Sequence, residues 1–299
     1  MKVKQPSTST VDMIDAFINN CKVRGLSEPT IYNYEHTCKM FNEVIQKNVQ
    51  NINSKDIDKF ILYLRNRGNN NTSIKTRIKV LKSFFVYAEI DVPIPTIKSA
   101  KSVKPPYTQE EINLLLKKPT INSYTQWRNH AIVSTLLATG IRSRTLLNLK
   151  VKDLDFNNGT IFLEKTKTSK QYYIPMSSAL KQTLKHYLSL FDHDMDSYVF
   201  LSLYGEQLTR ESLKQTIRDY NLKHGVSKTS VHLFRHTFAY NYLRNGGNVI
   251  FLQQILGHSN LETTKMYLHI TNEDLQQDFD SLCSLDTSRR KGIKLNSKK

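Results

Sequence analysis

The chain has 299 residues and a formal net charge of +17 at pH 7. This charge favours a polyanionic partner, most simply nucleic acid, because each neutralised phosphate releases counterions. The three cysteines have no metal-ligand spacing and argue against a disulfide framework. The longest apolar run, residues 131–141, is about half of the ~20 residues that a membrane helix needs. No signal peptide opens the chain, so we expect a cytoplasmic protein with no membrane partner.

Residues 8–90 have the pattern of a small helical domain. Apolar residues recur at helical spacing in four segments, which predict helices over residues 11–22, 27–45, 54–68 and 72–87. No strand pattern interrupts them, so the sequence predicts that this domain is all-helical.

The fourth predicted helix is strongly basic. Its cationic side chains surround an apolar stripe and are Lys75, Arg77, Lys79 and Lys82. A run of charge on a helix is often only a solvated face. The excess of one sign also fits contact with a DNA backbone, and both interpretations stay open.

Residues 91–106 contain four prolines and three lysines. The prolines prevent a helix from continuing through this segment. We interpret this segment as a basic, semi-extended linker that lets two domains close around a duplex. An ordinary domain spacer is the alternative.

The second predicted domain covers residues 107–285. Thr108 and Glu111 form a capping box at its start. A buried helix then runs from about Trp127 to the break at Gly140, and Arg142 follows, where a turn can direct its side chain into a cleft.

Short strands are predicted next, around residues 155–164 and 171–175, joined by tight turns. The tip between the last two strands is basic and contains Lys165, Lys167 and Lys170. Helices follow over about 178–190 and 209–224, and residues 286–299 form a basic flexible tail. The pattern predicts a mainly α fold with one small antiparallel sheet.

Chemistry-bearing side chains gather near the end of this domain. Arg235 lies one helical turn after His232, so both can face one point. His258 and Tyr267 follow nine residues apart. A guanidinium binds two phosphate oxygens at once, and an imidazole can move a proton near neutral pH. A phenol becomes a nucleophile when its proton is removed. The cluster therefore suits attack on a phosphodiester.

His232 and His236 could also begin a zinc site, but no third ligand lies at a useful spacing. We expect no metal there, and we expect His236 to be structural.

Taken together, Arg142, His232-x-x-Arg235, Leu256-Gly257-His258 and Tyr267 resemble the tyrosine recombinase, or phage integrase, family. The resemblance covers nearly the whole chain. It implies an N-terminal helical, SAM-like core-binding domain and a C-terminal α+β catalytic domain, in the two-domain layout of Xer-type and Cre-type enzymes.

The resemblance also implies roles for individual residues. Tyr267 would be the nucleophile, and His232 would be the general base. Lys167 would be the general acid, and Lys165 is the second choice for that role. If Lys167 has that role, Lys165 and Lys170 would contact DNA. The side chains that would stabilise the phosphoryl charge are Arg142, Arg235 and His258. This chemistry requires no metal and no nucleotide cofactor.

One departure concerns the surroundings of Arg142. Relatives commonly have an acidic residue shortly after this arginine, where this chain has Arg144 and Thr145. We therefore expect the support of Arg142 to differ, and the arginine itself to remain functional.

The implied function is site-specific DNA recombination through a 3′-phosphotyrosine and a Holliday junction, serving a mobile element or replicon resolution. The implied partners are double-stranded recombination sites, and the implied assembly is a homotetramer on two sites. The resemblance is also compatible with a monomer in the absence of DNA and with accessory DNA-bending proteins. It is compatible with association of the protein with the nucleoid as well. A topoisomerase with the same chemistry and a catalytically silent DNA-binding regulator are the alternatives.

The segment after Tyr267 has an amphipathic pattern. Leu275, Phe279 and Leu282 recur at helical spacing after a cap at Asn272. This stripe predicts a helix that covers its own domain or docks onto a neighbouring subunit, as the segments at the C-terminus of related recombinases do.

Overall fold

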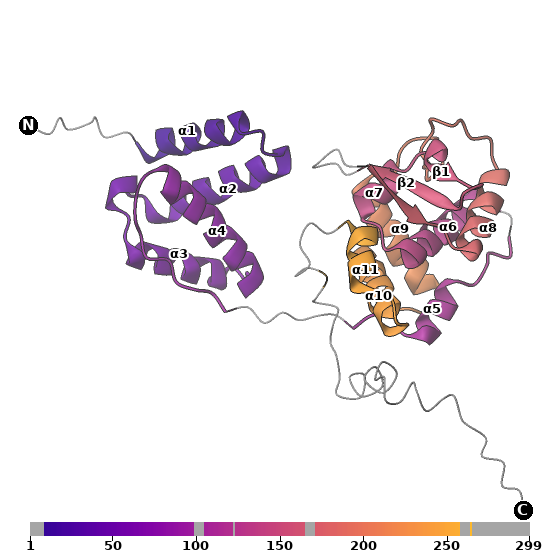
Figure 1. The fold of residues 1–299 in the computed structure, drawn as a ribbon. Helices are drawn as coiled ribbons and strands as arrows, with labels where there is room; N and C mark the ends of the chain where they lie inside the picture. Colours follow the sequence, from indigo (N-terminus) through magenta and orange to yellow (C-terminus); the bar gives the residue numbers. More distant parts are fainter. Residues whose placement is uncertain (1–8, 99–104, 122, 165–170, 258–263, 265–299) are drawn as a thin grey trace, which may run out of the picture. The chain divides into compact units, whose positions relative to one another are not determined.

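The computed structural model describes residues 9–98, 105–121, 123–164, 171–257 and 264. The chain divides into two compact units between Val103 and Lys104 (Figure 1). None of the described helices combines the length and the apolar character that crossing a bilayer requires.

The described part of the N-terminal unit is helical (Figure 1). Its helices are α1 (Thr10–Val23), α2 (Glu28–Ile45), α3 (Ser54–Asn66) and α4 (Asn71–Tyr87). Each presents an apolar stripe to a common core that is rich in phenylalanine, with Phe17, Phe41, Phe60 and Phe84 almost fully buried. The four predicted helices are all present.

Residues 91–98 have no helix, as the prolines predicted. Val92 and Ile97 are nevertheless buried in the core of the N-terminal unit, and the side chain of Asn71 donates a hydrogen bond to the carbonyl of Lys98. This part of the predicted linker therefore packs as part of the helical unit.

The C-terminal unit is mainly helical and contains one small sheet (Figure 1). Its helices are α5 (Gln109–Leu115), α6 (Tyr124–Thr139), α7 (Ser143–Asn148), α8 (Ser178–Ser189), α9 (Arg210–Lys223), α10 (Val231–Arg244) and α11 (Val249–Leu256). Helix α6 lies at the centre of the unit and packs against α8, α9 and α10. Its central residues are buried, as the apolar run in the sequence predicted.

The sheet has three antiparallel strands in the order β1–β2–β3. The strands are β1 (Leu154–Asp155), β2 (Thr160–Glu164) and β3 (Gln171–Pro175). Ile161 pairs with Ile174, and both are buried in the domain core. The predicted fold class, mainly α with a small antiparallel sheet, is confirmed.

Tyr107 attaches the start of the C-terminal unit to its interior. The ring is buried and lies 4.8 Å from that of Phe234. Its backbone N–H donates to the hydroxyl of Thr237, and its phenol donates to the carbonyl of Lys228. The capping box of Thr108 and Glu111 begins α5 immediately afterwards, as predicted.

Candidate active site

The position of Arg142 depends on the glycine that ends α6. Gly140 adopts a left-handed conformation with φ of 60°. A Cβ atom at this position would lie 2.5 Å from a ring carbon of Phe238 on α10, so only glycine fits without displacement. The chain then becomes extended at Arg142, which precedes the first residue of α7 and has an exposed side chain. The sequence prediction of a break followed by a cleft-facing arginine agrees with this geometry.

Arg235 lies on α10 and is almost fully buried, with only 3% of its surface exposed. Its Nη1 donates to the carbonyl of Gly140, and its Nη2 donates to the carbonyl of Leu256, both at 2.8 Å. A buried charge is costly unless hydrogen bonds replace its hydration, and these carbonyls supply such bonds.

Arg142 reaches the same end of α11. Its Nη1 donates to the carbonyl of Leu256 at 3.1 Å, and both terminal nitrogens lie 3.4 Å from the carbonyl oxygen of Gly257. The two guanidiniums therefore share Leu256 as an acceptor, although more than 90 residues separate them in the chain.

His232 lies one turn before Arg235 and lines the same groove as both arginines. His232 keeps an exposed surface, yet partial desolvation lowers the pKa of its imidazole below the ordinary value, and the charges of Arg235 and Arg142 lower it further. These influences favour the neutral ring, which can accept a proton.

These three side chains lie in a groove of about 770 Å³, which we call the basic groove. The described residues that line it include no Asp or Glu, and its cationic or titratable side chains are Arg142, Arg144, Arg210, Lys214, His232 and Arg235. A concave surface with this charge concentrates polyanions and stabilises phosphoryl oxygens.

Helix α9 contributes groups that our reading of the sequence missed. Arg210, Lys214 and Arg218 are exposed at spacings of four, so they share one face of the helix, and the first two line the basic groove. The spacing of four residues between these cations is the sequence signal that could have identified them. Tyr172 on β3 was also missed; burial raises the pKa of its phenol, and the charges of Arg142 and Arg235 offset only part of that rise.

Several predicted site residues lie outside the described residues. These are Lys165, Lys167, Lys170, His258 and Tyr267. Thr264, three residues before Tyr267, is described and is fully buried. His236 is half-buried beside the His232 ring. Among the described side chains, no group of three or more potential metal ligands gathers.

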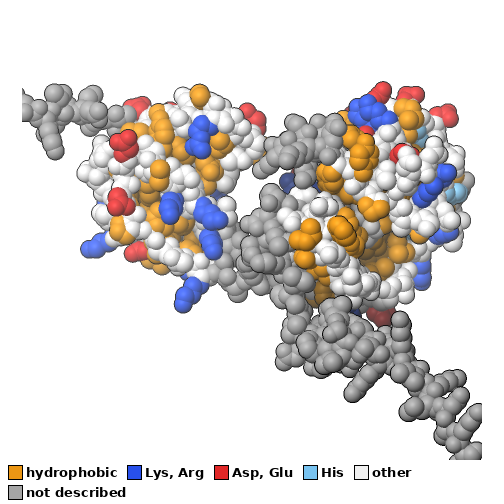
Figure 2. Space-filling model, viewed as in Figure 1, with side chains coloured by type: hydrophobic (Ala, Val, Ile, Leu, Met, Phe, Trp, Pro, Cys, Tyr) orange, Lys and Arg blue, Asp and Glu red, His pale blue; other side chains and the backbone are white. Residues whose placement is uncertain are grey.

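The basic residues of α4 separate into two groups. Lys75, Lys79 and Lys82 are exposed at spacings of four and three and form one face, which we call the α4 lysine stripe. Figure 2 shows Lys and Arg side chains over this helix. Arg77 is half-buried and points toward α2, where its Nη1 donates to the hydroxyl of Thr37 at 3.4 Å.

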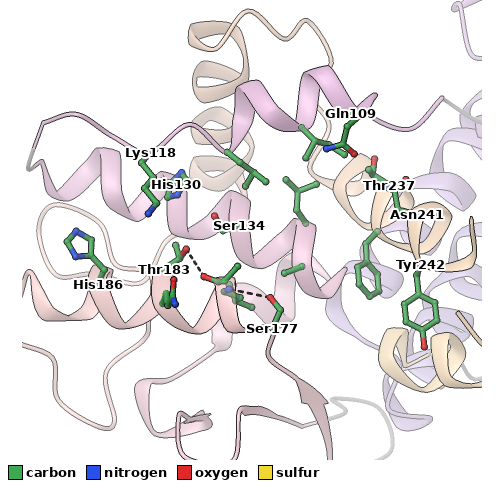
Figure 3. Close-up of a pocket in the computed structure, with 18 of the residues that line it drawn as sticks. Gln109, Lys118, His130, Ser134, Ser177, Thr183, His186, Thr237, Asn241 and Tyr242 are labelled. Carbon is green, nitrogen blue, oxygen red and sulfur yellow. Dashed lines mark hydrogen bonds between the residues drawn. The ribbon is translucent and has the colours of Figure 1, made fainter. Parts of the chain in front are cut away.

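A second, larger groove lies on another face of the C-terminal unit. It measures about 950 Å³, and we call it the apolar groove. Figure 3 shows its lining from α5, α6, α8 and α10, including Gln109, His130, Thr183 and Tyr242. Large apolar side chains form much of the floor, and Lys118 is the one formally charged residue among the described lining.

The fold and the site define a two-domain helical protein with an arginine-rich groove suited to phosphate. The phage integrase family model matches residues 107–274, and the model of the family's N-terminal SAM-like domain matches residues 13–91. The chain belongs to the phage integrase family, whose members are tyrosine recombinases.

Individual relatives agree with this assignment. Tyrosine recombinase XerC of Staphylococcus aureus (strain USA300 / TCH1516) is 30% identical over 283 residues, covering 88% of this chain and 93% of the relative. The crystal structure of XerA recombinase is 28% identical, with a TM-score of 0.51, and the match covers 91% of this chain and 98% of that one.

A Tn1549 transposon integrase in complex with a circular intermediate DNA has the same fold. It is 21% identical with a TM-score of 0.74, and the match covers 90% of this chain and 99% of the chain in that structure. The predicted family and fold are confirmed.

Proposed function

We propose that this protein is a site-specific DNA recombinase that cuts and rejoins strands through a covalent bond between Tyr267 and a 3′-phosphate. The observation that carries the proposal is the meeting of Arg142, Arg235 and His232 in one basic groove, where the lowered pKa of His232 favours its neutral form. Helix α11 supplies a shared acceptor, the carbonyl of Leu256, to the two arginines and ends two residues before His258.

In the proposed reaction, the oxygen of Tyr267 attacks phosphorus and its proton passes to His232. The bond from phosphorus to the 5′ oxygen breaks, and Lys167 protonates that oxygen. The guanidiniums of Arg142 and Arg235, with His258 as a further donor, stabilise the charge that develops on the phosphoryl oxygens. The residues in these roles require no metal. Reversal of the same steps with a different 5′-hydroxyl joins exchanged strands.

DNA contact outside the scissile phosphate would come from both units. The α4 lysine stripe suits contact with the phosphate backbone. Arg77 is better assigned to packing, because its guanidinium bonds to α2. On the C-terminal unit, Arg210 and Lys214 extend the basic groove along α9.

A substrate that traps the cleaved strand tests the proposal. Mixing the protein with DNA that carries a nick near the cleavage site should give a covalent adduct, and two intact sites should give recombinant products. Relaxed DNA without exchange would instead favour a topoisomerase of the same chemistry. Binding without any adduct would favour the catalytically silent regulator. The relevant sites would belong to a mobile element or a replicon.

For assembly, we propose that the apolar groove receives residues 272–282 of a neighbouring subunit in a tetramer on two DNA sites. This segment offers the stripe of Leu275, Phe279 and Leu282. It also has four acidic residues and no basic one, which complements a groove whose described lining has Lys118 and no carboxylate. Docking within the same chain is the competing arrangement.

Truncation after Thr271 should leave binding to a single site within a few-fold of the full chain and severely impair cooperative assembly and recombination. The physical reason is that the apolar stripe, which would couple neighbouring subunits, is removed. Gel-shift titration and a recombination assay measure the two effects.

Ala179→Trp, which fills the apolar groove, should reproduce this loss, whereas Ser178→Trp on the same helix should not, because Ser178 lies outside the lining. Normal recombination by a folded truncated protein would contradict the proposal. Loss of folding on truncation alone would indicate that the segment covers its own domain.

The general acid can be identified by comparing three lysines. Lys167→Ala should slow cleavage far more than Lys165→Ala or Lys170→Ala. A 5′-bridging phosphorothioate should restore the rate of that variant, because a thiolate leaves without protonation. The measurement is the single-turnover rate of adduct formation on both substrates. Rescue confined to Lys165→Ala would move the role to Lys165.

A further inference from the structure

The carbonyls at the end of α11 are the meeting point of the two arginines. Leu256 accepts from Nη2 of Arg235 at 2.8 Å and from Nη1 of Arg142 at 3.1 Å. Gly257 adds an acceptor at 3.4 Å from both terminal nitrogens of Arg142. The last carbonyls of a helix have no partner within the helix and carry its partial negative charge, so they suit two cations.

These carbonyls support Arg142 in a chain that lacks the acidic residue common in its relatives. No ion pair among the described residues involves Arg142, and Thr145 occupies the region where relatives commonly have an acid. Backbone oxygens therefore perform, in the described part of the chain, the orienting task that a carboxylate would perform.

The end of α11 is fixed by its own packing. Leu252 and Leu256 are fully buried and pack with Ala239 of α10. Gly257 adopts φ of 60° and ψ of 42°, and its N–H donates to the carbonyls of Gln253 and Gln254. A left-handed residue at this position directs its own carbonyl toward Arg142 and closes the helix.

We propose that Gly257 is a positioning residue that, through the carbonyls of Leu256 and itself, holds the guanidiniums of Arg142 and Arg235 at the spacing that one phosphate requires. The inference rests on the proposed recombinase function. Because His258 and Tyr267 follow Gly257 in the sequence, the residue that holds the two phosphate-binding arginines would also fix the start of the segment that contains the nucleophile.

The test compares two glycines that have the same backbone requirement. Gly257→Ala strains the end of α11. Gly225→Ala introduces the same strain after α9, where φ is 76° and no atom lies within 4 Å of an added Cβ. Gly257→Asn restores a residue that tolerates the left-handed region. For each protein, thermal unfolding, single-turnover cleavage at saturating DNA and the NMR signals of the Arg235 guanidinium without DNA are measured.

We expect Gly257→Ala to slow cleavage by about 10- to 100-fold, as small misplacements of catalytic groups do. We also expect it to merge the separate Nη signals of Arg235, because rotation of a released guanidinium averages them. Gly257→Asn should recover most of both. Gly225→Ala should lower the unfolding temperature to a similar extent and change neither the cleavage rate nor the signals.

Unchanged Nη signals in Gly257→Ala would overturn the proposal, even if cleavage fell, because the effect would then lie with the adjacent His258. If the alanine variant does not fold, the asparagine variant decides: loss of its separate Nη signals overturns the proposal. Separate Nη signals in a wild-type protein that forms no adduct would support the positioning and reject the recombinase function.

Discussion

Tyr267→Phe should leave DNA binding unchanged and eliminate the covalent adduct between protein and DNA. The substitution removes the attacking oxygen and keeps the ring, so contacts that hold the DNA are preserved while the bond to phosphorus cannot form. A nicked trapping substrate, followed by denaturing electrophoresis, measures the adduct, and a gel-shift titration measures binding.

The chain contains fifteen tyrosines, so a matched control is required. Tyr242→Phe changes a phenol on α10 that lines the apolar groove rather than the basic groove, and it should form adduct at the normal rate. If Tyr267→Phe still gives an adduct, another residue is the nucleophile.

Arg142→Ala and Arg235→Ala should each slow cleavage by about 100-fold or more, because losing one fixed donor to a developing oxyanion costs about 3 kcal/mol. Their effects on folding should differ. Arg235 is buried and its removal leaves the carbonyls of Gly140 and Leu256 without these donors, so its variant should also unfold at a lower temperature. Arg142 is exposed, and its variant should unfold near the normal temperature.

Single-turnover cleavage at saturating DNA and thermal unfolding separate these effects. Arg244→Ala is the matched control, because Arg244 is an exposed arginine on α10 that lies outside the basic groove. It should change neither measurement appreciably. Cleavage by Arg142→Ala within a factor of two of the wild-type rate would exclude this arginine from the active site.

Much of the fold was predictable because its signals are local. The capping box at Thr108 and the apolar periodicity of the first four helices need only neighbouring residues, and both are present in the structure. The start of the fourth helix was predicted one residue late, at residue 72, because Asn70 caps α4 and Asn71 is its first residue. Asparagine and serine cap about equally well, so the sequence alone does not separate them.

The site was predictable in part, for a physical reason. Arg142, His232 and Arg235 were recognised by residue type and spacing, and the structure gathers all three in the basic groove. Their acceptors could not be predicted, because the carbonyl of Leu256 is a backbone atom that any residue would supply. Helix α11 has only eight residues, and the pairing of Arg142 with Leu256 joins positions 114 residues apart.

The burial of Ile97 and of Tyr107 has a consequence for modular engineering. The core of the N-terminal unit extends to Ile97, and the core of the C-terminal unit begins at Tyr107. A chimaera that joins this catalytic unit to a foreign helical module should therefore be spliced between Lys98 and Pro105. A splice at residue 91, where the proline-rich segment begins, would carry Val92 and Ile97 into the chimaera without the helical core that buries them here. The exchangeable parts of this protein are consequently larger than its helices alone.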